Sequence, residues 1–66
     1  MTNIILEKAG RELFKATNTV DFVLIFRDSD WIAEIFNRKT DTYMIEHFKT
    51  CDQATSWAET HAKFKD

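Results

Sequence analysis

The segment VDFVLIF, residues 20 to 26, decides how this chain must fold. Six of its seven residues are apolar, and they do not alternate with polar residues as they would in a strand with one wet face. We therefore expect a strand that is covered on both faces. The cover has to come either from the rest of the chain or from a second molecule.

The length of the chain limits how much cover it can supply itself. Its 66 residues make one domain, residues 1–66, and a domain of this size buries only about 60% of the surface that its unfolded chain exposes. The one cysteine, Cys51, allows no internal disulfide. Six Phe, two Trp and one Tyr suggest that aromatic burial, or a homodimer, supplies the missing stability.

Charge and hydropathy exclude several classes of protein. The formal net charge of −2 gives no general attraction to nucleic acid or to anionic membranes. No apolar run approaches the roughly 18 residues of a membrane span, and the first residues, MTNIILEKAGRELF, lack the basic start of a signal peptide. We therefore expect a cytoplasmic protein that keeps its thiol reduced and does not bind membranes.

The N-terminal segment has the charge spacing of a helix over residues 3–16. Its charged residues fall on one face at helical spacing, and its apolar residues fall on the other. Glu7 and Arg11 stand four residues apart, as do Lys8 and Glu12, so each pair adds a few tenths of a kcal/mol to a helix. Asn18 suits the left-handed exit from such a helix.

Three strands and a second helix are expected in the rest of the chain. The strands are residues 20–27, 31–36 and 42–48, joined by the turns RDSD and NRKTD. Thr50 and Gln53 form a capping box for a helix over residues 51–64, with Trp57 as its central core residue. The predicted fold class is therefore α+β, in the order α-β-β-β-α: a three-stranded antiparallel meander with an N-terminal and a C-terminal helix.

Pairing Phe36 with Thr42 in the second hairpin defines two sheet faces. The first face takes the C-terminal helix, and its residues are Trp31, Ala33, Ile35, Tyr43, Ile45 and His47. The second face mixes large apolar groups with two glutamates, as protein interfaces do, and residues 4–14 cover part of it. The predicted partner-binding residues on that face are Ile32, Glu34, Phe36, Thr42, Met44 and Glu46.

A resemblance to a known family rests on two motifs, WIAEI at residues 31–35 and FKTCDQATSWAETHA at residues 48–62. Residues 22–64 resemble the ethylene-response-factor DNA-binding domain of plants and the related arm-type domains of phage and transposon integrases. The resemblance implies a three-stranded sheet packed on a helix. In that family, arginines and a tryptophan on the sheet face away from the helix enter the DNA major groove. Glu34 matches one contact residue, but Phe36 and Met44 stand where that family has Arg and Trp. Without arginines to neutralise phosphates, DNA binding is disfavoured.

The chain offers few residues for catalysis or metal binding. His47 lies on a strand, opposite the helix that carries His61, and Cys51 is the one obvious third ligand. A metal site needs three or four ligands. A thiol at a helix start is activated there, but catalysis also needs a base and an oxyanion site. We therefore predict no catalytic residue, no metal and no cofactor.

The carboxylates have simple structural interpretations. Asp28 and Asp30 flank Ser29 in a turn, and two carboxylates without a third ligand bind a cation weakly. Glu34 and Glu46 share the partner-binding face and line no cleft that general acid–base chemistry would need.

One basic cluster is expected in the sheet region. Its residues are Arg38 and Lys39 at a loop tip, together with Lys49 and Arg27. We interpret them as solvated loop residues, with phosphate contact as the alternative.

These features predict a small, acidic, non-enzymatic protein that binds another protein or self-associates as a homodimer. Its size and charge are typical of accessory proteins of phages and mobile elements. Some of these inhibit a host nucleic-acid-binding complex, so we predict an inhibitor of that kind. The alternative is a DNA-binding module of the integrase-arm or ethylene-response-factor type.

Overall fold

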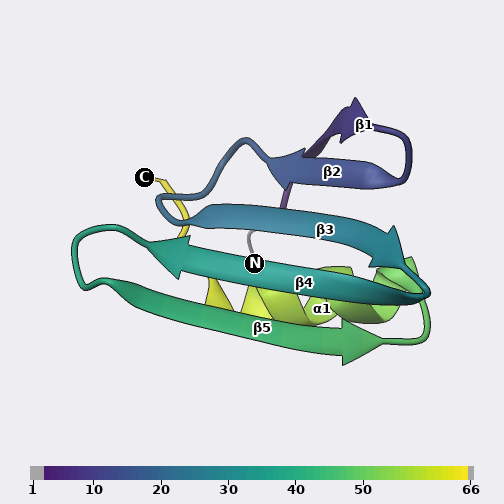
Figure 1. Ribbon diagram of the computed structural model, residues 1–66. Helices are drawn as coiled ribbons and strands as arrows, with labels where there is room; N and C mark the ends of the chain where they lie inside the picture. Colours follow the sequence, from purple (N-terminus) through teal and green to yellow (C-terminus); the bar gives the residue numbers. More distant parts are fainter. Residues whose placement is uncertain (1–2, 66) are drawn as a thin grey trace.

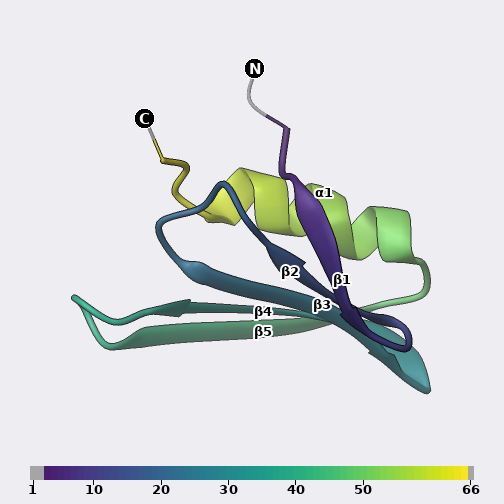
Figure 2. The same ribbon diagram turned by 90° about the horizontal axis from the view of Figure 1, so that it is seen from above.

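A computed structural model describes residues 3–65. It contains one antiparallel sheet of five strands in the order β1-β2-β3-β4-β5, followed by one helix, α1 (Figure 1). The elements are β1 (Leu6–Gly10), β2 (Leu13–Ala16), β3 (Phe22–Asp28), β4 (Asp30–Asn37), β5 (Thr42–Phe48) and α1 (Cys51–His61). The helix lies along one face of the sheet, and no described element lies over the other face (Figure 2).

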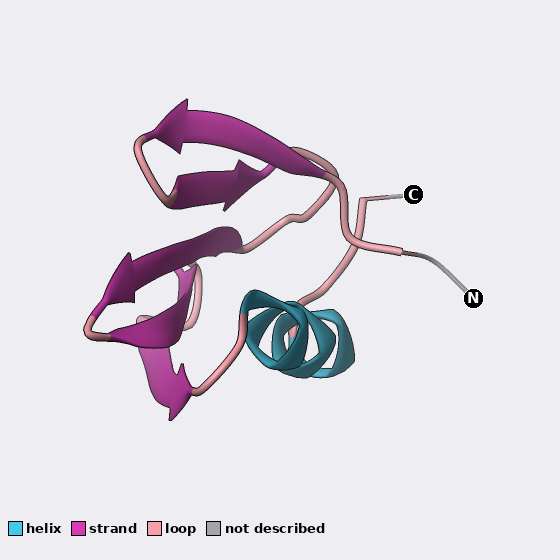
Figure 3. Ribbon diagram, turned by 90° about the vertical axis from the view of Figure 1, so that its right-hand side faces the viewer, coloured by secondary structure: helices cyan, strands magenta, loops and turns pink. Residues whose placement is uncertain are grey.

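The prediction of an N-terminal helix is wrong, and with it the α-β-β-β-α order. Residues 6–16 form the β1–β2 hairpin, which extends the sheet beside β3 (Figure 3). The same residues that have helical spacing also alternate, because Leu6 and Ala16 lie on the helix side while Glu7 and Lys15 lie on the other. Hydrogen bonding along β3 outweighs helix propensities of tenths of a kcal/mol per residue. The fold is therefore mostly β, and residues 4–14 leave the second face uncovered.

The other predicted elements lie close to those observed. The strands predicted at residues 20–27, 31–36 and 42–48 agree with β3, β4 and β5 within two residues. The Thr50 cap is confirmed, because its Oγ1 accepts the N–H of Gln53 at 3.1 Å. The Gln53 side chain accepts the N–H of Lys49 at 3.2 Å, rather than that of the cap residue. The helix ends at His61, three residues earlier than predicted.

The predicted register between β4 and β5 is wrong by one residue. The prediction pairs Phe36 with Thr42, but Asn37 pairs with Thr42 and Phe36 pairs with Tyr43. The connecting loop is therefore residues 38–41, and Asp41 closes it at φ 54°, in the left-handed region that Asp tolerates better than most residues. A shift of one residue moves every side chain of β5 to the opposite face.

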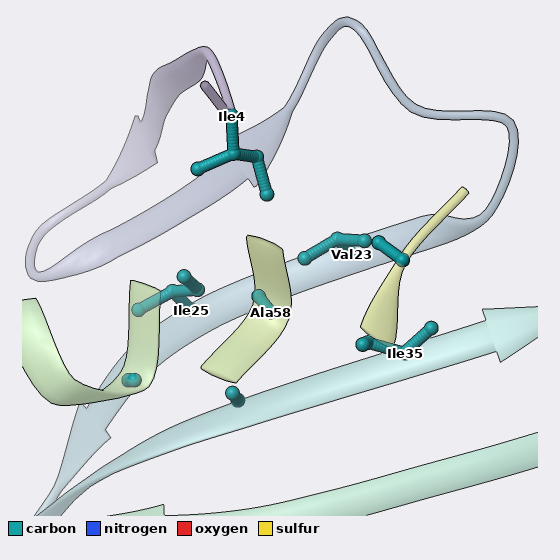
Figure 4. Packing of buried hydrophobic residues seen from close by; sticks show 8 residues of the cluster. Ile4, Val23, Ile25, Ile35 and Ala58 are labelled. Atoms are coloured by element: carbon teal, nitrogen blue, oxygen red, sulfur yellow. The ribbon is translucent and has the colours of Figure 1, made fainter. Parts of the chain in front are cut away.

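The core between α1 and the sheet is built mainly from small and β-branched side chains. Ala54, Ala58 and Ala62 follow one another at four-residue spacing and are all buried. Because alanine ends at Cβ, this stripe lets the helix pack closely on the strands. Figure 4 shows Ala58 over the sheet residues of this cluster. The buried residues of the cluster are Ile4, Val23, Ile25, Ala33, Ile35, Ala54, Ala58 and Ala62.

Trp57, predicted to be the centre of the core, lies at its margin. Its side chain is half-buried, with the ring centroid 6.0 Å from that of Phe48 and 4.7 Å from that of His61. Ile45, predicted to lie on the face that takes the helix, lies on the opposite face of the sheet. The aromatic side chain therefore flanks the alanine stripe.

The segment after α1 is fastened to the loop before β3. Asp21 is only 7% exposed, and its Oδ1 accepts a hydrogen bond from Nδ2 of Asn37 at 2.7 Å. Its Oδ2 accepts the backbone N–H of Lys63 at 2.8 Å. An isolated bridge between Thr19 and Phe64 lies beside these bonds. One carboxylate thus joins the ends of β3, β4 and the helix.

Candidate functional site

The side of the sheet away from α1, here called the open face, carries three rows of side chains that follow the strand pairing. The aromatic row crosses β3, β4 and β5 as Phe22, Phe36 and Tyr43. The central row crosses β2 to β5 as Lys15, Leu24, Glu34 and Ile45. The inner row crosses the same strands as Leu13, Phe26, Ile32 and His47. Eight of these eleven side chains are apolar or aromatic.

The two faces of VDFVLIF explain its lack of alternation. Val23 and Ile25 lie under the helix and are 2% and 0% exposed. Phe22, Leu24 and Phe26 alternate with them and lie on the open face. The first set is covered within the chain, whereas the second has no covering element among residues 3–65.

The aromatic side chains expected to build the core do not form its centre. Four of them pack against it from its margin: Trp31, Phe48, Trp57 and Phe64. All nine lie in the described part of the chain, and none is among its buried residues. Phe22 is 61% exposed and Tyr43 is 55% exposed, while Phe26 and Phe36 are half-buried. Four of the nine therefore gather on the open face. Large exposed apolar patches are often found at interaction sites.

Within residues 3–65, Tyr43 and Glu34 form the one side-chain hydrogen bond across this face. The Tyr43 hydroxyl donates to Oε1 of Glu34, which lies on β4 two residues before Phe36, the direct partner of Tyr43. This hydrogen bond, with a smaller contribution from the negative charge of Glu34, raises the pKa of Tyr43 above its usual value of 10.0. The hydrogen bond orients the Glu34 carboxylate toward the Tyr43 hydroxyl. The apolar surface of the aromatic row lies next to this carboxylate.

The structure divides the six predicted partner-binding residues between the two faces. Ile32, Glu34 and Phe36 lie on the open face as predicted. The placement of the other three beside them is wrong, because Thr42, Met44 and Glu46 pair with helix-side residues of β4. Their places on the open face are taken by Tyr43, Ile45 and His47. The four-residue loop 38–41 sets this register.

The β3 residues of the open face were also missed as partner-binding candidates. Phe22, Leu24 and Phe26 follow from the apolar run itself once β3 is a central strand. They were not predicted as partner-binding residues because the helix expected at residues 3–16 was assigned to cover part of this face.

A shallow hollow adjoins the aromatic row. Its volume is about 440 Å³, and its lining residues are Val20, Phe22, Phe36, Asn37, Arg38 and Lys39. The predicted basic cluster does not form as one group. Arg38 and Lys39 follow β4, whereas Arg27 is near the opposite end of β3, 3.7 Å from Glu12.

The candidate metal and catalytic residues are separated in space. His47 lies on the open face, with Nδ1 3.9 Å from Oδ2 of Asp30. His61 lies in the last turn of α1, with its Nδ1 2.9 Å from the carbonyl of Trp57. Cys51 is half-buried at the start of the helix, with Sγ 3.9 Å from Oγ1 of Thr55. Within residues 3–65 no three His, Cys, Asp or Glu side chains come together in a way that could hold a metal ion.

Comparison of the chain with models of protein families, with curated proteins and with solved structures found no match. In the described part of the chain, no helix is both long enough and apolar enough to cross a membrane.

Proposed function

We propose that this protein is a non-enzymatic protein-binding module and that the open face is its working surface. The observation that carries the proposal is the position of the aromatic side chains. Four of nine lie on a sheet face that nothing in residues 3–65 covers. Burying apolar surface is the main favourable term in protein association, and Tyr and Phe are enriched at interfaces.

The small number of charges on this face favours a protein partner with an apolar surface. Among the described residues, the three rows hold one lysine, Lys15, and one carboxylate, Glu34, and a second carboxylate, Glu7 of β1, pairs with Lys15 on the same face. The acidic Asp28 and Asp30 stand outside the rows, at the turn that ends β3. Apolar side chains therefore outnumber charged ones in these rows, as they do in the core of a protein interface.

Two neighbouring residues of β5 provide a matched test. Ile45 is 42% exposed on the open face, and Met44 is 38% exposed on the helix side. A lysine at either position is close to the surface, so neither Ile45→Lys nor Met44→Lys should unfold the domain. Only Ile45→Lys places a charge in the proposed interface, where burying it without a partner is costly.

The experiment is quantitative affinity capture with the wild type and both variants, followed by binding measurements on the purified partner. We expect the same partner to be retained by the wild type and by Met44→Lys, and to be lost with Ile45→Lys. A partner retained equally by Ile45→Lys would show that another surface does the binding. Thermal unfolding of both variants confirms that each is folded.

A second candidate function is binding of nucleic acid, which the aromatic row and the hollow favour. Phe22, Phe36 and Tyr43 lie across three adjacent strands, and Arg38 and Lys39 line the adjoining hollow. Unpaired bases stack on aromatic rings, while cations neutralise the phosphates. Duplex recognition of the integrase-arm type would instead require arginines along the strands.

Fluorescence anisotropy with a labelled single-stranded oligonucleotide at several salt concentrations tests this candidate. Binding that weakens steeply with salt, and that is lost in Arg38→Ala, would favour nucleic acid over protein as the ligand. The proposed role as a cytoplasmic inhibitor from a phage or mobile element rests on size and charge alone. The captured partner would support or contradict it.

A further inference from the structure

We propose that a basic, extended segment of the partner protein adds to the sheet as a further strand, antiparallel to β5. This inference rests on the proposed function, because the apolar side chains of the segment lie beside Tyr43 and Ile45 and so enlarge the open face. The surface that holds the segment is a different one: it is the backbone edge of β5.

The outer edge of β5 is unpaired and regular. β5 is the last strand of the sheet, and among the described residues no strand pairs with its outer edge (Figure 1). Its register with β4 runs through all seven residues without a bulge, and six of the seven are exposed. Its outward N–H and C=O groups therefore form an uninterrupted row, which an extended backbone can pair with.

The opposite edge of the sheet is built differently. β1 has only five residues, and its register with β2 shifts between Lys8 and Gly10. A short strand, a bulge and a lysine are means by which proteins keep a sheet edge from pairing with other chains. β5 contains neither lysine nor a bulge, and it exposes Tyr43, Met44 and Ile45. The unprotected edge is therefore the one at β5.

The charges at this edge favour a basic segment. β4 and β5 together hold three carboxylates, Asp30, Glu34 and Glu46, and one histidine, His47, but no lysine or arginine. β1 and β2, at the other edge, hold one glutamate and two lysines. The connections on either side of β5 carry more cations than carboxylates: Arg38, Lys39, Asp41 and Lys49. A complementary segment therefore has its cation opposite the strand rather than at its own ends.

Glu46 fixes the position of that cation. Its side chain is exposed on the helix side of β5, and within residues 3–65 it takes part in no ion pair. Directly opposed residues of antiparallel strands have their Cβ atoms about 5 Å apart, and opposite charges there stabilise the pairing. A lysine or arginine of the added strand therefore faces Glu46.

Alternation then fixes the neighbouring positions of the segment. Successive side chains point to opposite faces, so the residue after the cation faces Ile45 and the third residue after it faces Tyr43. Both lie on the open face and call for apolar side chains, while the residue between them faces Met44 on the helix side. The segment therefore carries a lysine or arginine, an apolar residue, a residue of any kind and a second apolar residue, in that order.

A second copy of this chain does not supply such a segment. Since β5 holds no lysine or arginine, pairing of β5 with its own copy places no cation opposite Glu46. β1 carries Lys8, but the bulge that follows it interrupts the strand. The occupant is therefore a segment of a different protein.

A fluorescein-labelled peptide, acetyl-Gly-Thr-Lys-Val-Thr-Val-Thr-Gly-amide, is the probe. It carries the proposed order of side chains, and we expect anisotropy to show binding with a Kd below about 1 mM. Amide hydrogen exchange, recorded by NMR, should slow at alternate residues of β5 in the complex because their outward N–H groups gain partners. The amides of β1 should be unaffected.

An exchange of charges tests the position of the cation. Glu46→Lys sets like charges opposite each other, so we expect it to weaken binding of the peptide at least about threefold. A peptide with glutamate in place of its lysine should recover that loss. Glu7→Lys makes the same change of net charge at an exposed position of β1 and should leave binding unchanged. Circular dichroism confirms that both variants are folded.

Two N-methylated peptides separate backbone pairing from contact with a face. The N–H groups of alternate residues in an antiparallel strand point to opposite edges. Methylation of one alternating set therefore removes the donors toward β5, and methylation of the other set leaves them in place. We expect one methylated peptide to lose binding at least about tenfold and the other to bind like the parent.

Several results would each overturn strand addition. They are a Kd above about 1 mM, protection of β1 instead of β5, equal effects of the two methylations, and equal effects of Glu46→Lys and Glu7→Lys. Protection of the β5 amides on concentration of the chain without peptide would make a second copy the occupant. These results leave the proposed function standing, because it is tested separately by partner capture with Ile45→Lys and Met44→Lys.

Discussion

Asn37 pairs with Thr42, and this one pairing decides which side chains of β5 reach the open face. The Asn37 side chain supports the pairing from two sides. Its Oδ1 accepts the N–H of Lys39 at 3.0 Å inside the loop, and its Nδ2 donates to Asp21 at 2.7 Å. The loop and the start of β3 are thus held by the same amide.

Removal of the Asp21 carboxylate should therefore destabilise the whole domain. Asp21→Ala breaks the bonds to Asn37 and to the N–H of Lys63 and leaves two partly buried donors without partners, at a cost of about 1–3 kcal/mol. Urea unfolding measures the loss. Asp28→Ala, at an exposed position at the end of the same strand, is the control and should change the stability by less than about 0.5 kcal/mol. Equal stabilities for the two variants would contradict the structural role of Asp21.

The alanine stripe predicts that α1 tolerates substitution at some positions better than at others. Ala58 is 0% exposed against the sheet, so Ala58→Leu overpacks the contact and should cost about 1–3 kcal/mol or more. Trp57 is half-buried, so Trp57→Ala should leave a folded domain with a cooperative melt. Thermal unfolding compares the two. A melting temperature of Ala58→Leu equal to or above that of the wild type would show that the helix does not pack closely on the sheet at this position.

Titration of Tyr43 tests the contact inside the open face. The hydrogen bond to Glu34 favours the neutral phenol, so the pKa of Tyr43 should lie above 10.0 and fall toward that value in Glu34→Gln, where the negative charge is gone. The stability that this bond contributes is present below the ordinary tyrosine pKa and is lost as the pH rises through the raised pKa. Ultraviolet absorbance of the phenolate measures the titration. A pKa unchanged by Glu34→Gln would contradict the hydrogen bond.

The turn between β3 and β4 contains a residue in an unfavourable backbone conformation. Ser29 has φ 67°, which a residue with a Cβ adopts at a cost and glycine adopts freely. Ser29→Gly should therefore be stabilising or neutral, within about 1 kcal/mol. Ser56→Gly, in the exposed face of α1, is the matched control and should lose about 1 kcal/mol of stability. Losses of equal size at both sites would contradict the strain at Ser29.

The C-terminal half of the fold could be predicted because its local signals agree with its tertiary context. The Thr50 cap, the apolar run at residues 20–26 and the turn residues all mark elements that the structure contains. Residues 6–16 could not be assigned in this way, because their charges have helical spacing while the pairs Leu6–Ala16 and Glu7–Lys15 also suit the two faces of a hairpin. Only the free edge of β3, which is not visible in the local sequence, decides between the two.

The open face was only partly predictable for the same reason. Ile32, Glu34 and Phe36 follow from β4 alone, since alternation fixes them relative to one another. The β5 residues depend on the Asn37–Thr42 register, and a single-residue error in a loop exchanges Ile45 for Met44. Loop conformation, here a left-handed Asp41, has to be known before side chains can be assigned to a face.

The central claim is that the open face is buried against protein when this molecule works. The most direct measurement is the relaxation of methyl groups by a soluble paramagnetic probe, recorded by NMR on the dilute chain and on the concentrated or partner-bound chain. Leu24 and Ile45 report on the open face, while Val23 and Ile25 report on the helix side. We predict that the methyl groups of Leu24 and Ile45 become protected from the probe on association, while those of Val23 and Ile25 remain protected throughout. Methyl groups of Leu24 and Ile45 that stay equally accessible in every state would contradict the account.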